Sequence, residues 1–347
     1  MKVFHSRQHE AHSPQFFLQR GLVKACEEQS ERADLLLHGA ISAGLTEDSG
    51  KSWGLSEKRA VHTGNYLQFL SEAHKLWRDL PEHGPEVLAN VHPLERRTTN
   101  YPNSIIGRAG WHMADLACAI GEGTYDAAIA AADIALSAAD NLILTSQPGY
   151  ALCRPPGHHA SADAAAGHCY LNNIAIAAQH LRSAYERVAI LDIDVHHGNG
   201  TQSIFYQRND VLTVSIHADP VDFYPFYQGY ADETGEGIGK RYNKNFPLPV
   251  GSSEQQWFSA VGQGIAEAVE FDAQCLLIAL GLDAHIDDPL GALKVTTEGF
   301  GKIGSMIGGL TGSRKLPVLL VQEGGYLSPV LGENIESFLS GFLKSYS

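Results

Sequence analysis

The sequence is short of paired cysteines, of positive charge and of long apolar runs, and each shortage excludes a class of protein. Its five cysteines are scattered among 347 residues without a Cys-x-x-Cys pair, which favours reduced thiols over a disulfide framework. Lys and Arg number 25 against 39 Asp and Glu, a formal charge of −14 that repels nucleic-acid phosphates and anionic lipid. The chain begins without an apolar signal core, and no uninterrupted apolar run approaches the roughly 18 residues of a membrane span. We expect a cytoplasmic protein that binds neither nucleic acid nor membrane.

Apolar residues make up 44% of the chain and charged residues 18%, enough for a large core and too apolar for wholesale disorder. Because no repeat or strong domain boundary is visible, we expect one domain over 1–347. An insert at about 90–110, with Arg96, Arg97, Pro102 and little periodicity, is too long for an ordinary connection. Three interpretations fit it: a lid, a loop that binds a partner, and a solvated insertion.

Five short apolar runs predict buried strands, because near-continuous apolarity is typical of parallel strands covered on both faces. The runs are 150–153, 188–193, 211–216, 275–280 and 316–321. The helix-like stretches before and between them are 125–140, 172–185 and 253–270. This alternation predicts an α/β fold with a central, mostly parallel sheet flanked by helices. Ligands of such sheets bind beyond the carboxyl ends of the strands, so we expect the functional site there.

The sharpest motif, Asp-Ile-Asp-Val-His-His-Gly-Asn-Gly, spans 192–200 at the end of one apolar run. Side chains alternate between faces along an extended backbone, so Asp192, Asp194 and His196 are expected on one side. Two carboxylates beside an imidazole are unfavourable unless a cation compensates them, and these ligand atoms suit Zn²⁺ or a similar divalent ion. The alternative is a buried hydrogen-bonded cluster at the edge of the sheet.

Other strand ends carry further parts that a metal hydrolase needs. Asp283 follows an apolar run, and His158 and His159 lie side by side after a Pro-Pro-Gly turn. Tyr326 follows two glycines that would let the chain approach a ligand closely. Each residue alone has an ordinary explanation as a helix cap, a polar loop residue or a packing residue. Together with the aspartate–histidine motif, they indicate a metal-dependent hydrolase.

These motifs resemble those of the histone deacetylase superfamily, and within it the bacterial acetylpolyamine amidohydrolases. In chain order they are Arg-Pro-Pro-Gly-His-His (154–159), Gly-His-Cys-Tyr-Leu-Asn-Asn (167–173), the 192–200 motif, Gly-Leu-Asp-Ala-His-Ile-Asp-Asp-Pro (281–289) and Glu-Gly-Gly-Tyr (323–326). The resemblance covers nearly the whole chain. It implies the arginase/deacetylase fold, one Zn²⁺ per chain, hydrolysis of an acylated amine or amide, and a homodimer.

The resemblance also implies the metal ligands. Asp194, His196 and Asp283 match the three zinc ligands, which leave coordination positions for water and substrate. A monovalent-cation site beside the zinc, for K⁺, matches oxygen atoms of Asp192, Asp194, His196, Ser215 and Ile216. A second such site matches Phe205, Arg208, Val211 and Tyr242.

The catalytic roles follow from the same resemblance. His158 and His159 match the tandem general base and general acid, with Asp192 orienting the first ring and Asn199 the second. A carboxylate beside one ring and an amide beside the other should give the two imidazoles unlike pKa values. Tyr326 matches the phenol that donates a hydrogen bond to the developing oxyanion.

Gly167, His168 and Tyr224 match the wall of the narrow substrate tunnel, where most relatives have an aromatic ring in place of His168. In acetylpolyamine amidohydrolases the insert closes the mouth of the site across a homodimer, and its acidic residues hold distal ammonium groups. This chain instead has isoleucines at 105 and 106, Ala117, and arginines at 96, 97 and 108, while Glu95 and Asp115 remain as carboxylates.

The substrates that stay open are acetylated polyamines, other small N-acyl amines, acyl-lysine peptides, and small N-substituted amides including man-made ones. Two further classes remain as alternatives. One is an arginase-like ureohydrolase, which would hold two manganese ions, and the other is a non-catalytic binder of acylated amines. Intact tandem histidines and the Gly-Gly-Tyr element disfavour both.

Overall fold

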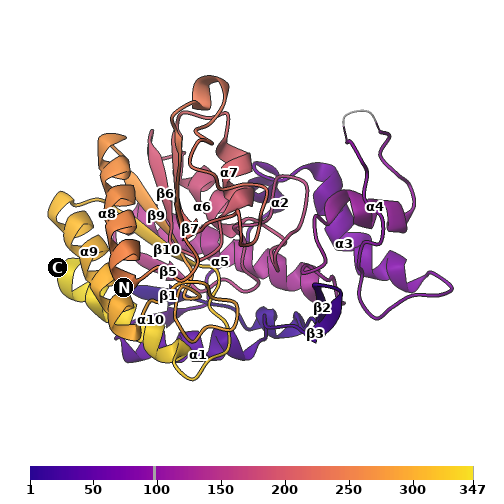
Figure 1. The fold of residues 1–347 in the computed structure, drawn as a ribbon, viewed down its shortest axis with the longest axis horizontal. Helices are drawn as coiled ribbons and strands as arrows, with labels where there is room; N and C mark the ends of the chain where they lie inside the picture. The colour runs from indigo at the N-terminus through magenta and orange to yellow at the C-terminus, as the bar shows by residue number, and fades with distance from the viewer. Residues whose placement is uncertain (97–98, 347) are drawn as a thin grey trace.

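The apolar runs form the middle of a parallel sheet in the computed structural model, which describes residues 1–96 and 99–346 (Figure 1). Arg97, part of the predicted insert, lies outside the described residues. The strands of the sheet are β1 (Lys2–Phe4), β4 (Thr46–Asp48), β5 (Gly149–Ala151), β6 (Val188–Asp192), β7 (Val211–Ala218), β8 (Asn243–Leu248), β9 (Cys275–Leu280) and β10 (Val318–Gln322). Among the described residues their order is β4-β1-β5-β10-β9-β6-β7-β8, and every neighbouring pair runs parallel.

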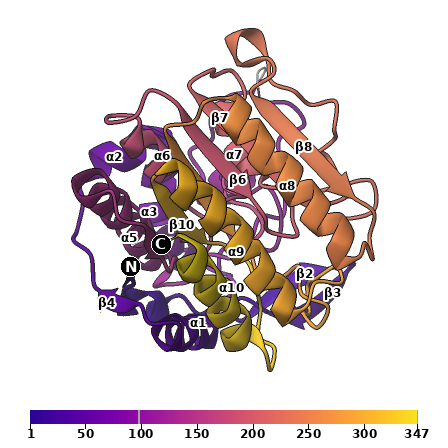
Figure 2. The same cartoon turned by 90° about the vertical axis from the view of Figure 1, so that its left-hand side faces the viewer.

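Helices cover both faces of this sheet. They are α1 (Glu31–Ser42), α2 (Leu55–Arg59), α3 (Gly64–Arg78), α4 (Ile105–His112), α5 (Thr124–Thr145), α6 (Asn173–Leu181), α7 (Asn199–Phe205), α8 (Glu254–Glu270), α9 (Thr297–Arg314) and α10 (Leu331–Tyr346). Apolar side chains of α1, α8, α9 and α10 pack on one face, and those of α5 and α6 pack on the other. Figure 2 shows α8, α9 and α10 lying in front of the strands. The predicted α/β fold with its mostly parallel sheet is confirmed.

Alternate residues of each central strand face the two helical layers. Along β6, Ala189 and Leu191 belong to the core under α8, whereas Val188 and Ile190 belong to the core under α5 and α6. Both faces are therefore apolar, which explains why the sequence has continuous apolar runs rather than an alternating pattern. The run at 316–321 begins its strand only at Val318, because Pro317 has no N–H to donate to the sheet.

Helix α5 is long and apolar enough to cross a membrane by length and composition. Its apolar window is 72% buried inside the protein, where Ala135, Ala138 and Leu142 contact the sheet core. A helix that is apolar on most of its surface is typical of a protein core. We therefore interpret α5 as a buried helix that packs on one face of the sheet.

The insert lies away from the sheet, beside α3 and α4 (Figure 1). Ile105 and Ala109 of α4 pack with Phe69 and Leu70 of α3 in a separate apolar cluster. Before α4 the chain has little regular structure, and Leu94 is fully exposed. A short antiparallel hairpin, β2 (Phe16–Gln19) and β3 (Leu22–Ala25), stands apart from the main sheet.

Candidate active site

The chemically important side chains follow the carboxyl ends of neighbouring parallel strands. β6 ends at Asp192, which is in register with Ala279 of β9, so Asp194 and His196 emerge beside the segment that carries Asp283. Parallel neighbours end at the same edge of a sheet, and this topology alone brings residues 87 to 130 positions apart in the chain into contact.

Asp194, His196 and Asp283 form a buried group whose ligand atoms all lie within 4.8 Å of one another. The Nδ1 atom of His196 is 3.1 Å from Oδ1 of Asp194 and 3.1 Å from Oδ2 of Asp283. Both carboxylates are fully buried. Two carboxylate oxygens and one imidazole nitrogen are the donors that a zinc ion takes in a three-ligand site.

Glycines form the floor and wall of this group. A Cβ atom at Gly281 would collide with the carboxylate of Asp194, and one at Gly324 would collide with that of Asp283. The N–H of Gly324 donates to Oδ2 of Asp194 at 2.7 Å, and the N–H of Val195 donates to Oδ1 of Asp283 at 2.9 Å. These bonds fix the carboxylates in place, and only glycine leaves room for them.

The charges of the group call for a cation. Burial by itself lowers the pKa of His196, but its hydrogen bonds to Asp194 and Asp283 raise that pKa to about 10. Burial, together with the charge of Asp194, raises the pKa of Asp283 to about 7. The protein thus stabilises positive charge between two carboxylates, and the group fits a divalent cation on its donor atoms, its burial and its charge.

The tandem histidines lie next to this group, each held by a different partner. Nδ1 of His158 is 2.9 Å from Oδ2 of Asp192, and Nδ1 of His159 is 2.8 Å from Oδ1 of Asn199. The ring centroids of the two histidines are 4.0 Å apart. Both Nδ1 atoms therefore face acceptors, which directs the Nε2 atoms toward the metal-ligand side of the site.

The two imidazoles differ in their affinity for a proton. Burial lowers the pKa of His158, but the carboxylates of Asp192 and Asp194 outweigh burial and raise it to about 10. Burial also lowers the pKa of His159, and the neighbouring charges of His158 and His196 lower it further, well below the ordinary value. One ring consequently holds a proton at neutral pH while the other is free to accept one.

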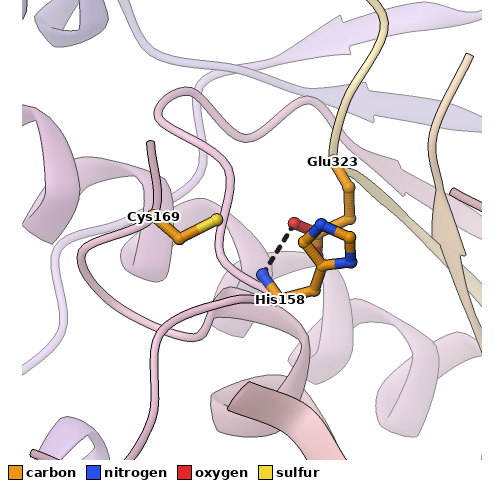
Figure 3. Close-up of side chains that lie close together, drawn as sticks. All are labelled: His158, Cys169 and Glu323. Atoms are coloured by element: carbon orange, nitrogen blue, oxygen red, sulfur yellow. Dashed lines mark hydrogen bonds between the residues drawn. The ribbon is translucent and has the colours of Figure 1, made fainter. Parts of the chain in front are cut away.

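A buried carboxyl group holds the loop that carries these histidines. Oε2 of Glu323 accepts from the backbone N–H of Gly157 at 2.7 Å. It also accepts from the backbone N–H of His158 at 3.0 Å, the bond drawn in Figure 3. The thiol of Cys169 lies beside them, and its ligand atom is within 4.8 Å of those of His158 and Glu323. Burial raises the pKa of Glu323 to about 7 and keeps the Cys169 thiol protonated by raising its pKa. We interpret this group as the support of the histidine loop.

Tyr326 is buried at the same edge, after β10. Its backbone N–H donates to Oδ2 of Asp288 at 2.7 Å, and the guanidinium of Arg32 lies 4.8 Å from its ring centroid. Arg32 also donates to the carbonyl oxygens of Gly325 at 2.5 Å and Glu323 at 2.8 Å. Burial raises the pKa of the Tyr326 phenol well above 10, so its hydroxyl group stays available as a donor.

Sequence reasoning missed the buried ions behind Tyr326. Glu28 accepts from Arg32 at 2.6 Å and from Arg154 at 2.9 Å, and all three side chains are almost fully buried. Arg154 begins the Arg-Pro-Pro-Gly-His-His motif and was a visible signal. The only signal for Glu28 and Arg32 was their spacing of four residues at the start of a helix, which is common on any helix surface.

The predicted wall residues lie together near the tandem histidines. The hydroxyl group of Tyr224 donates to Oδ2 of Asp115 at 2.6 Å, and the N–H of Gly167 donates to the same oxygen at 3.0 Å. The rings of Tyr224 and His159 are 5.0 Å apart, and those of His168 and Tyr326 are 6.0 Å apart. Gly167 has a φ of +49°, and a Cβ atom there would strike the ring of His159, which explains the glycine.

The residues that match a cation site beside the zinc come from two adjoining strands, β6 and β7, and from the segment that follows β6. Ser215 of β7 is in register with Asp192 of β6, and Ile216 follows it. The hydroxyl oxygen of Ser215 is 2.8 Å from Nδ1 of His217. The residues of the second predicted site lie at the end of α7 and the start of β7, apart from Tyr242, which precedes β8.

Comparisons with known proteins agree with this architecture. The histone deacetylase domain family matches residues 26–342. An acetylpolyamine amidohydrolase from Burkholderia pseudomallei is 44% identical over 99% of this chain and 98% of its own length. An acetylpolyamine amidohydrolase from Mycoplana ramosa is 34% identical over 98% of this chain and 99% of its own length.

Solved structures show the same likeness. A crystal structure of acetylpolyamine aminohydrolase from Burkholderia pseudomallei has a TM-score of 0.95 at 43% identity and covers 99% of this chain and 98% of its own. The HDA15 HD domain has a TM-score of 0.78 at 27% identity, with 99% of this chain and 88% of its own covered.

Proposed function

Because the chain belongs to the histone deacetylase family, we propose that it is a zinc-dependent amidohydrolase that hydrolyses small N-acylated amines such as acetylated polyamines. The observation that carries this proposal is the meeting of three groups at one edge of the sheet. These are the Asp194–His196–Asp283 donor set, the paired histidines and the buried phenol of Tyr326. A protein that only bound acylated amines would need neither the proton-transfer pair nor the oxyanion donor.

Asp194, His196 and Asp283 would hold the zinc ion. When bound, zinc supplies Lewis acidity, which polarises a carbonyl group and brings the pKa of water down to about 7. Around it, the chain contributes fixed carboxylates and a buried, water-poor environment. The glycines at 281 and 324 let both carboxylates lie close to the backbone, because a Cβ atom at either position would collide with them.

The paired histidines divide the proton transfers between them. The sequence predicts His158 as base and His159 as acid, but the raised pKa of His158 leaves the base role to His159. His159, bonded to the neutral amide of Asn199, accepts the proton of the attacking water and later delivers it to the leaving amine. His158, bonded to the carboxylate of Asp192, stays protonated and stabilises the negative charge that develops. The hydroxyl group of Tyr326 donates to the oxyanion. Water and the amide thereby yield a carboxylate, such as acetate, and a free amine.

Acyl-lysine peptides and neutral N-substituted amides form a second candidate substrate class. The observation that favours them is the presence of isoleucines at 105 and 106, where carboxylates were expected; Ile105 is buried and Ile106 is exposed. A cation site needs negative charge close by, and this part of the insert supplies none at those positions.

Four further assignments accompany the proposal. Residues 1–347 form a single catalytic domain, and the chain works in the cytoplasm. It forms a homodimer whose insert covers the mouth of the neighbouring site, and K⁺ binds beside the zinc. The register of Asp192 with Ser215 supports the potassium assignment. The five cysteines are buried and unpaired, as suits a reducing cytoplasm.

A hydrolysis screen tests the function. Zinc-loaded protein is offered acetylputrescine, acetylspermidine, an acetyl-lysine peptide and a neutral N-alkylacetamide, and release of acetate is measured. The proposal expects hydrolysis with the highest kcat/KM on the acetylated polyamines. Faster hydrolysis of the peptide or the neutral amide would favour the second substrate class, and no hydrolysis of any of them would refute an amidohydrolase.

A further inference from the structure

The wall residue His168 is a buried polar ring set between two aromatic rings. Its ring centroid is 5.7 Å from that of Phe17 and 6.0 Å from that of Tyr326, and only 6% of its surface is exposed. Burial lowers the pKa of His168 to about 4, so the imidazole is neutral at physiological pH. A neutral imidazole has one nitrogen that donates a hydrogen bond and one that accepts.

Cys26 identifies which nitrogen of His168 carries the hydrogen. The Sγ atom of Cys26 is 3.8 Å from the carbonyl oxygen of Glu28, an atom that can only accept, so the single thiol hydrogen points there. The same sulfur is 3.8 Å from Nδ1 of His168. Since the sulfur has no second hydrogen to offer, we infer that it accepts from Nδ1, which makes Nδ1 the donor. The other ring nitrogen, Nε2, therefore carries a lone pair.

That lone pair is unused. Across residues 1–96 and 99–346, Nε2 of His168 has no hydrogen-bond partner, yet it is not one of the nitrogen atoms sealed inside the protein. It therefore keeps some accessible surface in a ring that is otherwise buried. This chain therefore places a hydrogen-bond acceptor in the predicted wall of the substrate tunnel.

Uncompensated negative charge lies beside this acceptor. Asp115 accepts from the N–H groups of Ala117 and Gly167 and from the hydroxyl group of Tyr224, which are all neutral donors. In the described part of the chain, no Lys or Arg side chain pairs with Asp115. Gly167 directly precedes His168, so the carboxylate and the free lone pair border the same wall. An acceptor next to a carboxylate that only neutral donors contact suits a cationic N–H donor.

We propose that His168 is a specificity-determining residue that accepts a hydrogen bond from a protonated amine in the chain of the substrate, beside the negative charge of Asp115. This inference rests on the proposed amide hydrolysis and names the substrate class within it. It also explains how a site with isoleucines at 105 and 106 and Ala117 selects cationic amines, because Asp115 supplies the negative charge.

Two substrates of equal length isolate this interaction. Acetylputrescine ends in an ammonium group, and N-pentylacetamide has a methyl group in its place. We expect the wild-type protein to prefer acetylputrescine by about tenfold in kcat/KM, the size of one hydrogen bond to a charged group. His168→Phe restores a flat aromatic wall without an acceptor, and the preference should fall to about twofold.

A matched pair of variants at Cys26, which does not face the substrate, tests the assigned hydrogen. Cys26→Ser keeps one hydrogen to donate and lone pairs to accept, so the preference for acetylputrescine should persist. Cys26→Ala removes the acceptor that holds the Nδ1 hydrogen, and the preference should fall as in His168→Phe. Zinc content and a cooperative thermal transition establish that each variant is folded.

Three results would overturn the inference: equal kcat/KM for the two amides in the wild type, a preference that survives His168→Phe, or an equal loss in both Cys26 variants. Each of these leaves amide hydrolysis intact, since both substrates are still cleaved. If the zinc-loaded wild type cleaves neither amide, the proposed function itself has failed, and the assignment of His168 fails with it.

Discussion

The hydroxyl group of Tyr326 is the only part of that side chain that the proposed chemistry uses. Tyr326→Phe keeps the buried ring and its contact with Arg32 but removes the donor. Loss of one oxyanion donor typically costs about 100-fold or more in kcat. We therefore expect turnover to fall by that amount while the bound zinc stays at one ion per chain, measured by steady-state kinetics and metal analysis.

Tyr227 provides the control for that variant, because its side chain is 89% exposed and the proposed chemistry gives it no role. Tyr227→Phe should leave kcat and zinc content unchanged. Wild-type turnover in Tyr326→Phe would remove the phenol from the mechanism.

Glu28 tests the buried ions that support Tyr326. Burial raises the pKa of Glu28, but the charges of Arg154, His12 and Arg32 outweigh burial and hold it well below its ordinary value of 4.5. Glu28→Gln leaves two guanidinium groups buried without a counter-charge, which should lower the free energy of unfolding by about 3–5 kcal/mol. Urea denaturation at pH 7 measures this, with exposed Glu10→Gln as a control expected to stay within about 0.5 kcal/mol.

The same pKa shift predicts how stability depends on pH. A carboxyl group whose folded pKa lies below its unfolded pKa stabilises the folded state fully above the unfolded value. The contribution of Glu28 is therefore complete above about pH 4.5 and is lost as the pH falls below it. Between pH 5 and pH 3, the free energy of unfolding should fall less in Glu28→Gln than in the wild type. If it falls equally in both proteins over this range, Glu28 is not ionised in the folded protein.

At the level of elements, the central strands could be predicted from the sequence and the outer ones could not. β6, β9 and β10 are covered on both faces, and burial on both faces demands the continuous apolar runs that were recognised. β4 reads Thr-Glu-Asp and β8 begins Asn-Lys-Asn, since each lies at an edge of the sheet with a partner on one side only. Their pairing depends on distant segments, which local patterns do not encode.

The site residues also divide into those that the sequence predicts and those that it does not. Asp192, Asp194 and His196 could be grouped because a strand end fixes their common side within five residues of sequence. Asp115 could not be placed, because its bonds to Gly167 and Tyr224 join loops separated by 52 and 109 residues. Contacts of this kind exist only once the sheet has brought the loops together.

The insert and the histidine loop are joined by Arg96. Its guanidinium pairs with both carboxylate oxygens of Asp163 at 3.0 Å, in the loop that links His159 to Gly167. Arg96→Gln should remove a contribution of about 1 kcal/mol or less to the stability of this loop, because the ion pair is partly exposed. We expect KM for acetylputrescine to rise by up to about fivefold with kcat nearly unchanged.

Arg108, on the same insert, is the matched control for Arg96, because it pairs with Glu72 on α3 and not with the histidine loop. Arg108→Gln should leave KM at the wild-type value. An equal rise in KM in both variants would show that the insert as a whole, and not its contact with Asp163, shapes the site.

For the whole molecule, the proposed homodimer makes a prediction about exposed apolar side chains. Leu94 is fully exposed on the insert, with Val91 55% exposed nearby in the chain. If the insert covers a partner, Leu94→Glu should give monomers in light scattering, because a charge in an apolar interface is unfavourable. Leu144→Glu changes a side chain that is 75% exposed on α5, away from the insert, and should leave the dimer intact. Dimers of Leu94→Glu at micromolar concentration would place the interface elsewhere.

The central claim is that one divalent ion, held by Asp194, His196 and Asp283, is required for hydrolysis. The most direct measurement is a titration of chelator-treated protein with zinc, in which bound metal and acetylputrescine hydrolysis are followed together. The account predicts that activity returns in proportion to zinc and reaches its full value at one ion per chain, and that Asp194→Asn neither binds zinc tightly nor regains activity. Full activity in metal-free protein, or a requirement for two manganese ions per chain, would contradict it.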